Sequence, residues 1–350
     1  MDPQGQFVAA LLDASGRAYA SGAVQRLRDH APESEVDRLG SARLIADTQA
    51  RIACLAESLA SGRPELFEHE ITWLGSTWTA RGVSRQLLNG LLVSLREELA
   101  EDLPTVAATR ACEVIDRALG RLSAELPESA TALVDGLPHL ELARQFLGAI
   151  LEGHRRPALD LIAQAFESGV TIPELHGHVL ARVQSELGRL WQVGSTIASE
   201  EHVGTRIVED ALALLRVHMQ PEPTNGRCVL IASVRGNLHD IGARMVADQF
   251  ELAGWRSVLL GADTPTDNLV EAASLFSADL LALSAGRGHN VRATAEIVSV
   301  VREHLPHLPV LVGGRPFSLL PDLWQAVGAD GSAIDAPGAV REGSRLLKAT

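Results

Sequence analysis

The sequence is poor in cysteine, in basic side chains and in long apolar runs, and each shortage excludes a class of protein. Only 3 cysteines occur in 350 residues, with no Cys-x-x-Cys pair, so neither a disulfide framework nor a cysteine-rich zinc site is expected. Lys and Arg total 31 against 44 Asp and Glu, and the net charge of −13 disfavours direct DNA binding. No apolar run reaches the roughly 20 residues of a membrane-spanning helix, so no membrane association is expected.

The remaining composition is that of an ordinary folded protein. Hydrophobic residues make up 46% and charged residues 21%, and the length predicts two or three domains. The first residues, Met1-Asp2-Pro3-Gln4, lack a basic stretch followed by an apolar run, so no signal peptide is expected. Together with the few cysteines, this predicts a cytoplasmic protein.

Residues 1–219 show helical periodicity throughout. Apolar residues recur three and four positions apart, as in Leu87, Leu88, Leu91, Leu92, Leu95 and Leu99. Prolines at intervals mark helix starts or connections, because proline is disfavoured inside a helix. The segment Leu126–Pro138 carries two prolines and a glycine. We therefore predict an all-helical domain over 1–136 and a helical bundle over 137–219.

After the Pro-rich linker at 219–227 the pattern changes to strands that alternate with helices. Short apolar runs occupy Cys228–Val234, Ser257–Leu260, Leu280–Ser284 and Val310–Val312, with helical stretches at about 240–253, 266–277 and 290–305. Such alternation predicts βαβ units around a parallel sheet. Residues 220–350 are therefore expected to form a flavodoxin-like, Rossmann-type domain whose ligand lies at the carboxyl ends of the strands.

The loop after the first predicted strand places a histidine at that edge. It reads Arg235-Gly236-Asn237-Leu238-His239-Asp240-Ile241-Gly242, and a neutral imidazole is a good ligand for a transition metal. Asn237 lies two residues away and could orient the second ring nitrogen. The alternative is a surface histidine that helps to cap the following helix.

Small residues follow two further strands. Ser284-Ala285-Gly286 comes after the third and Gly313-Gly314 after the fourth, at the same edge as His239. Small side chains on adjacent strand ends would leave a groove beside the sheet for a long ligand tail. The alternative is that these glycines simply end their strands.

The pattern Asn237-x-His239-x-x-Gly242, then Ser284, then Gly313-Gly314 resembles the cobalamin-binding domain of methionine synthase, corrinoid methyl carriers, base-off mutases and light-sensing regulators. The resemblance implies that His239 is the lower ligand of cobalt and that Ser284, Gly313 and Gly314 line the groove for the displaced dimethylbenzimidazole. It places Asn237, Asp240, Gly242 and Gly286 beside the cofactor. Two positions depart from the family motif, since Asn237 replaces an aspartate and Gly286 a leucine.

In the preceding bundle, Trp191 is followed after nine residues by the pair Glu201-His202, with a predicted helix break at Gly194–Thr196. This spacing resembles the cobalamin-dependent photoreceptors, and the resemblance implies that Trp191, Glu201 and His202 surround the adenosyl group of adenosylcobalamin. Gln192 stands where DNA-binding members have a histidine. Without that context, a core tryptophan and a helix-start Glu-His pair would explain the same residues.

The stretch from Phe67 to Arg85 gathers two tryptophans with His69, Arg81 and Arg85. Arginines can pair with propionates and aromatic rings can stack on a conjugated system, although a core helix with solvated arginines would look the same. The domain order resembles photocobilins, in which a globin-like domain binds biliverdin beside cobalamin. The resemblance makes His69, Arg81 and Arg85 candidate bilin contacts. A covalent link to Cys54 or Cys112 is not expected, because both lie in apolar helical runs.

We therefore predict a non-enzymatic light sensor that binds adenosylcobalamin base-off, with biliverdin as a candidate second chromophore. Light-driven cleavage of the cobalt–carbon bond would change the assembly of a homo-oligomer. No winged-helix pattern is present, so the output would pass through assembly or a partner that the sequence does not identify. The alternatives are a corrinoid methyl carrier of a methyltransferase system, and a scaffold whose cobalamin domain binds nothing.

Overall fold

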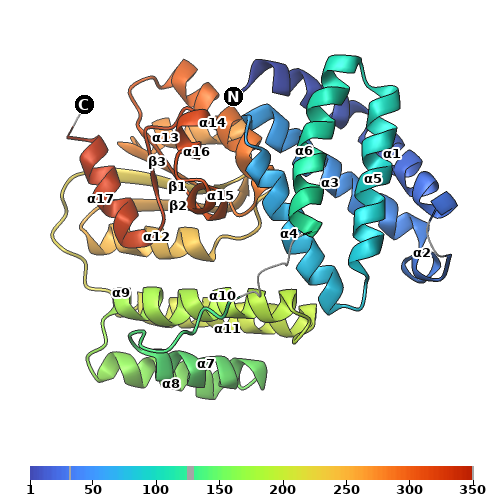
Figure 1. Cartoon of the computed structure of the whole chain (residues 1–350). Helices are drawn as coiled ribbons and strands as arrows, with labels where there is room; N and C mark the ends of the chain where they lie inside the picture. Colours follow the sequence, from blue (N-terminus) through green and yellow to red (C-terminus); the bar gives the residue numbers. More distant parts are fainter. Residues whose placement is uncertain (31–32, 124–129, 349–350) are drawn as a thin grey trace. The chain divides into compact units, whose positions relative to one another are not determined.

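The computed structural model describes residues 1–30, 33–123 and 130–348, and its contacts divide the chain into two compact units. The first unit comprises residues 1–128 together with Gly288–Arg292, and the second comprises residues 129–287 and 293–350. Figure 1 gives the order of the elements along the chain. None of the helices in the described ranges is both long enough and apolar enough to span a bilayer.

The first unit is helical, as predicted. Its long elements are α1 (Pro3–His30), α2 (Glu33–Leu39), α3 (Ser41–Ser61), α4 (Pro64–Ala80), α5 (Arg85–Asp102) and α6 (Thr105–Ser123), and it also takes in the short 3-10 turn η2 (Gly288–Asn290). Pro64 occupies the first turn of α4, where its missing N–H leaves no hydrogen bond unmade. The Ser84 hydroxyl caps α5 by accepting a hydrogen bond from Leu87 N. The leucine stripe of α5 is buried in the core of this unit.

The second unit begins with the helical bundle. Its elements are α7 (Leu140–Leu151), α8 (Arg155–Glu167), α9 (Ile172–Glu174), η1 (Leu175–Leu180), α10 (Ala181–Gln192) and α11 (Ala198–Arg216). Because α9, the π-helical turn η1 and α10 follow one another without a break, the bundle has four helical rods. The Thr171 and Glu174 side chains form a capping box that starts the third rod. The predicted break at Gly194–Thr196 is confirmed, since it falls between α10 and α11.

The α/β part contains five parallel strands in the order β2-β1-β3-β4-β5, the flavodoxin-like order that the sequence predicted. The strands are β1 (Cys228–Val234), β2 (Arg256–Thr264), β3 (Leu280–Ser284), β4 (Val310–Gly313) and β5 (Gly331–Ala333). The helices are α12 (Ile241–Leu252), α13 (Thr266–Leu275), α14 (Val291–His304), α15 (Arg315–Leu319), α16 (Leu323–Ala326) and α17 (Ala336–Leu346).

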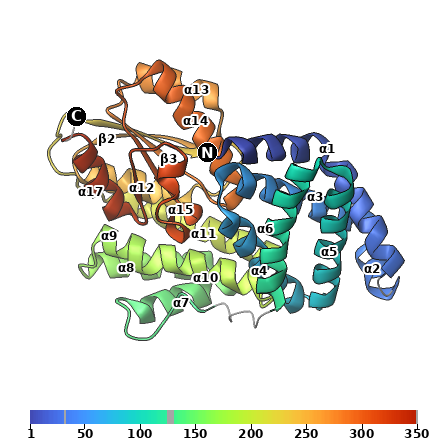
Figure 2. The same ribbon diagram turned by 45° about the horizontal axis from the view of Figure 1, so that its top comes forward.

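Helices cover both faces of this sheet, with α12 and α17 on one face and α13 and α14 on the other (Figure 2). Every residue of β1 is buried, as expected for a central strand of a parallel sheet. On the α12 side, Val229 and Ile231 pack with Phe250 into one apolar cluster. The ring of Trp255 meets that of Phe250 edge-on, with 5.0 Å between the centroids.

Within the second unit, the bundle packs on the α/β part through α11 and α12. Met245 of α12 belongs to the apolar core of the bundle. Near the other end of the contact, the Arg216 guanidinium lies 3.2 Å from the Asp248 carboxylate and 3.0 Å from Glu251. Glu209 lies closer to the start of α12, 4.0 Å from Arg244. The two helices therefore run alongside each other, which brings the first turns of α11 to the level of the loop that precedes α12.

Candidate functional site

The residues predicted to line a groove lie where neighbouring strands end. Ser284 at the end of β3 pairs in register with Gly313 of β4, which in turn pairs with Ala333 of β5. All three residues are only partly buried, unlike the strand interiors. The structure therefore brings Ser284 and Gly313 together at the carboxyl edge of the sheet.

Gly314 fixes the backbone directly after β4, where the next helix begins. Its φ is +101°, a value that residues other than glycine rarely adopt. A Cβ at this position would lie 2.1 Å from the Ala285 carbonyl oxygen. Gly313 is less constrained, because its Cβ would lie 3.0 Å from Ala333 O. The two adjacent glycines thus differ: Gly314 allows two backbone segments to approach, whereas a side chain at Gly313 would meet only one neighbouring carbonyl.

The loop with His239 is held by hydrogen bonds from its neighbours. The Asp263 carboxylate, at the end of β2, accepts a hydrogen bond from Gly236 N at 2.8 Å, and Asp263 N donates to Asn237 O at 3.0 Å. Asp263 adopts φ +49°, a strained value that these two hydrogen bonds help to maintain. Sequence reasoning missed Asp263, because nothing local connects it to a loop 27 residues earlier.

The sequence suggested that Asn237 orients the imidazole of His239. The structure shows that it does not. Its side chain is almost completely buried, and its amide nitrogen donates to Ser284 O at 3.0 Å. Its amide oxygen accepts from the main-chain N–H of His239 at 3.1 Å. Both polar atoms of the carboxamide thus form hydrogen bonds with main-chain groups. Through them Asn237 links the β1–α12 loop to the end of β3.

The absence of a side chain at Gly286 leaves the space that the Asn237 carboxamide occupies. A Cβ at position 286 would lie 2.5 Å from Asn237 Oδ1 and 3.3 Å from His239 Nδ1. A leucine there could not coexist with this placement of Asn237. The two departures from the family motif, at positions 237 and 286, are thus spatial neighbours that fit each other.

His239 projects its ring with no hydrogen bond to either nitrogen from the described part of the chain. Loss of hydration around the ring lowers the pKa of His239, the charge of Arg287 lowers it further, and the Glu201 carboxylate opposes both. The neutral form that results is the one that binds metals. No cluster of three metal-binding side chains occurs among the described residues, and His239 offers a single imidazole as a metal ligand.

Asp240 and Gly242 flank this histidine differently. The Asp240 carboxylate is committed to Arg244, at 2.9 Å. A Cβ on Gly242 would meet no other atom of the described chain within 4 Å, and its φ is not positive, so the fold itself does not require glycine there. Gly242 is exposed in the first turn of α12, three residues after His239.

The bundle residues singled out by sequence lie at the start of α11 and the end of α10. Trp191 is half-buried, and Glu201 is partly covered while His202 is exposed. The His202 ring nitrogen Nδ1 lies 2.9 Å from Glu201 Oε2. The Glu201 carboxylate favours the protonated form of His239 and so acts to raise the pKa of that imidazole. Sequence reasoning missed Gln184 and Thr205, which extend the contacts of Glu201. Helical periodicity places Thr205 one turn after Glu201, but it does not show that Gln184 of another helix meets it.

Several large apolar side chains are exposed around this region instead of being buried. Leu238, beside His239, is 73% exposed, and Ile334, directly after β5, is 75% exposed. Ile197 and Val203 are exposed at the start of α11. Exposed apolar side chains at strand ends and helix starts are candidates for contact with a ligand.

The candidate bilin residues lie in the first unit. His69 is on α4, and Arg81 and Arg85 flank the turn before α5; all three are exposed, while Trp78 is buried in the core. Cys54 and Cys112 are both buried, and burial raises the pKa of each thiol, which weakens it as a nucleophile. The assignment of a bilin to these residues stays a prediction.

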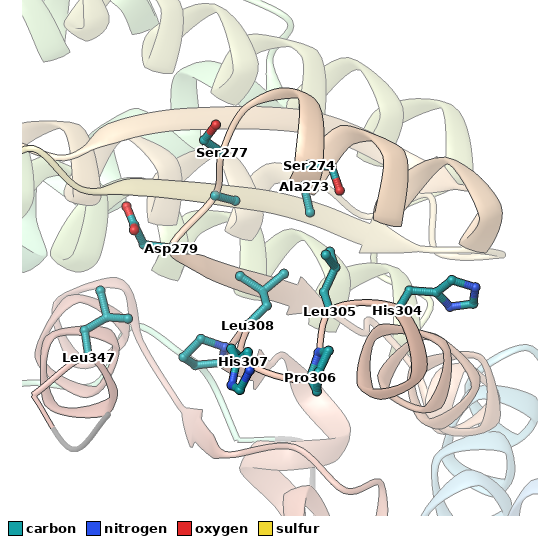
Figure 3. Close-up of a pocket in the computed structure, with 12 residues that line it drawn as sticks. Ala273, Ser274, Ser277, Asp279, His304, Leu305, Pro306, His307, Leu308 and Leu347 are labelled. Carbon is teal, nitrogen blue, oxygen red and sulfur yellow. The ribbon is translucent and has the colours of Figure 1, made fainter.

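A cavity of about 500 Å³ lies elsewhere in the α/β part, at the amino end of β3 and β4 (Figure 3). The end of α13, the loop with His307 and Leu347 line it. It is at the edge of the sheet opposite to His239. The cavity is thus separate from the groove.

Two family models match this chain, and both describe a B12 binding domain. One covers residues 142–216, which form most of the bundle, and the other covers residues 227–342 of the α/β part. The two matches contain His239 and the groove residues as well as Trp191 and Glu201.

Curated relatives include corrinoid proteins and one repressor. A corrinoid protein of Desulfitobacterium hafniense is 25% identical over 216 residues, covering 59% of this chain and 98% of that protein. The HTH-type transcriptional repressor CarH of Myxococcus xanthus is 25% identical over 210 residues, covering 60% of this chain and 69% of that protein. The monomethylamine corrinoid protein of Methanosarcina barkeri shares the fold, with a TM-score of 0.54 and 19% identity over 59% of this chain and 99% of that chain.

Proposed function

We propose that this corrinoid-binding chain, which carries B12 binding domains at residues 142–216 and 227–342, holds adenosylcobalamin and acts as a light sensor. His239 would bind cobalt from below, and the groove beside Ser284, Gly313 and Gly314 would take the displaced base. Trp191, Glu201 and His202 would contact the upper ligand. The observation that carries the proposal is that α11 runs alongside α12, held by ion pairs such as Arg216–Asp248, which brings Glu201 at the start of α11 to the level of the His239 loop.

The role of the protein follows from how these residues are held. When bound, the cofactor supplies a cobalt–carbon bond that visible light can cleave. The tie from Asn237 to Ser284 keeps the His239 loop at the groove, and the exposed side chains of Leu238 and Ile197 would be covered from water. Loss of the upper ligand would leave Trp191 and Glu201 without that contact, which would alter the packing of bundle on sheet and thereby the assembly state.

A methyl carrier is the second candidate, because a named corrinoid protein aligns over 98% of its own length with this chain. Such a carrier would hold methylcobalamin and pass its methyl group between methyltransferases. It would not need contacts to an adenosyl group from Trp191 and Glu201. The two functions therefore differ in the upper ligand that the protein prefers.

Biliverdin remains a proposed second chromophore of the helical unit. The proposal rests on the family resemblance and on the ability of arginines such as Arg81 and Arg85 to pair with the propionates of a bilin. Incubation of the purified protein with biliverdin would then give far-red absorption, and Arg81→Ala with Arg85→Ala would weaken it. A spectrum equal to the sum of free bilin and protein would reject this part.

The light-sensor proposal is tested on full-length protein loaded with adenosylcobalamin in the dark. Green light is expected to change the cobalt absorption spectrum and to shift the elution volume in size-exclusion chromatography. His239→Ala should lose most of the bound pigment. His307→Ala is the matched control, because this histidine lies by the opposite edge of the same sheet.

Three results separate the alternatives. A light-stable spectrum with tight methylcobalamin binding would favour the carrier. Failure to bind either cobalamin would favour an empty scaffold. Equal pigment retention by His239→Ala and His307→Ala would remove the basis of the proposed site.

A further inference from the structure

A chain of hydrogen bonds crosses from α10 to α11 and ends at Glu201. Gln184 Nε2 donates to Thr205 Oγ1 at 2.8 Å, and Thr205 Oγ1 donates to Glu201 Oε1 at 2.8 Å. The other carboxylate oxygen of Glu201 is the one near His202. Neither Gln184 nor Thr205 belongs to the Trp-x9-Glu-His motif.

Helix geometry explains why these side chains meet. Thr205 lies four residues after Glu201, one turn along the same face of α11. Gln184 precedes Trp191 by seven residues, or two turns, so both project from one side of α10. The chain of hydrogen bonds thus lies on the seam that also carries the tryptophan.

The direction of this chain is set by proton count. A threonine hydroxyl has a single proton, and its acceptor side is taken by the Gln184 amide, so the proton is left for Glu201. Gln184 Oε1 is buried and has no partner within the described structure. If the carboxamide turned over, this oxygen would accept the Thr205 proton, and Glu201 would lose its anchor.

From this arrangement, and resting on the proposed function, we propose that Gln184 and Thr205 are positioning residues that aim the Glu201 carboxylate and so make the protein prefer an adenosyl over a methyl upper ligand. A carboxylate is an acceptor, and the ribose hydroxyls of an adenosyl group are donors that it can bind. A methyl ligand offers no donor. Fixing the carboxylate in advance therefore favours only the adenosyl form.

The test compares dark binding of adenosylcobalamin and methylcobalamin, measured by absorption titration. Thr205→Val removes the hydroxyl at nearly constant shape, and Gln184→Glu supplies a carboxylate that takes the Thr205 proton. Each variant is expected to bind adenosylcobalamin about fivefold more weakly, with methylcobalamin binding unchanged. Thr205→Ser keeps the hydroxyl and should retain the wild-type preference.

Ser185→Ala is the matched control, since this exposed hydroxyl on α10 bonds to Ala181 O of its own helix. Thermal unfolding of the cofactor-free variants separates a folding defect from a positioning effect, and Gln184→Glu provides the second route if Thr205→Val unfolds. A wild-type preference in Thr205→Val or Gln184→Glu overturns the inference. So does an equal loss in Thr205→Ser. If the wild-type protein binds no cobalamin, it is the proposed function that fails.

Discussion

The Asn237 amide oxygen lies 2.5 Å from the point where a Cβ on Gly286 would stand. This closeness couples two loops that follow different strands, β1 and β3. The Asn237 carboxamide fills the space that a side chain at 286 would need, and it uses that position to bond to Ser284 O. The arrangement of the His239 loop therefore depends on the absence of a side chain at a distant position of the chain.

Replacing Gly286 should displace the His239 loop. In Gly286→Ala the new methyl group would overlap Asn237 Oδ1, so the tie to Ser284 should break and cobalamin retention should fall several-fold. Cofactor-free stability should drop by about 1–3 kcal/mol, as for other overpacked sites. Urea unfolding and pigment retention measure the two effects. Gly242→Ala is the control for stability, since nothing in the described chain lies within 4 Å of its Cβ.

Asn237→Asp keeps the shape of the side chain but replaces the donor to Ser284 O with an acceptor. Two oxygens would then face each other in a buried site, and we expect the cofactor-free protein to lose about 2 kcal/mol of unfolding free energy. Urea denaturation at neutral pH measures this loss. Stability equal to the wild type would mean that the hydrogen bond from Asn237 contributes nothing.

The two groove glycines should respond differently to alanine. Gly314→Ala would force a side chain into a positive-φ position against the Ala285 carbonyl and should cost about 3 kcal/mol or more. Gly313→Ala meets Ala333 O only at 3.0 Å, so it should fold. It should nevertheless weaken cobalamin binding by narrowing the groove. Unfolding midpoints test the first statement, and equal stability of the two variants would contradict it. Dark cobalamin affinity tests the second, and wild-type affinity of Gly313→Ala would contradict that one.

Asp248 makes the contact between bundle and sheet sensitive to pH. Burial raises the pKa of Asp248 from 3.8 to about 6, and the nearby Arg216 only partly offsets this. A carboxyl whose folded pKa exceeds its unfolded value destabilises the fold above about pH 6, and this penalty disappears as the pH falls below about 4. Asp248→Asn should therefore raise the unfolding free energy at about pH 8 by up to about 3 kcal/mol, with the gain shrinking toward about pH 4.

Unfolding curves across this pH range measure the gain. Glu251→Gln is the control, because Glu251 pairs with the same Arg216 but is far more exposed. A gain in Asp248→Asn that is independent of pH would show that ionisation of Asp248 is not its source.

Much of the architecture was predictable because its signals are local. Hydrophobic periodicity predicts buried strands such as β1 and β3 and the helices between them. The ends of the strands, and with them the position of the His239 loop, could therefore be predicted. The position of Gly194–Thr196 between two helices likewise follows from its composition. These features depend on neighbours within a few residues.

The contacts of the site were harder to foresee. Asn237 was expected to serve the imidazole of His239, but a carboxamide bonds to whichever buried group the fold brings near, and that group is Ser284 O. Asp263 and the pair Gln184–Thr205 could not be assigned, since their partners lie 21 or more residues away on other elements.

The sequence by itself determined the helical and α/β parts and the residues that meet at the carboxyl edge of the sheet, because strand direction alone sends those residues to one edge. The tertiary structure decided which polar atoms hold His239 and Glu201 in place. That choice depends on the register between packed helices and on the space left by Gly286, and neither is encoded in the spacing of residues along the chain.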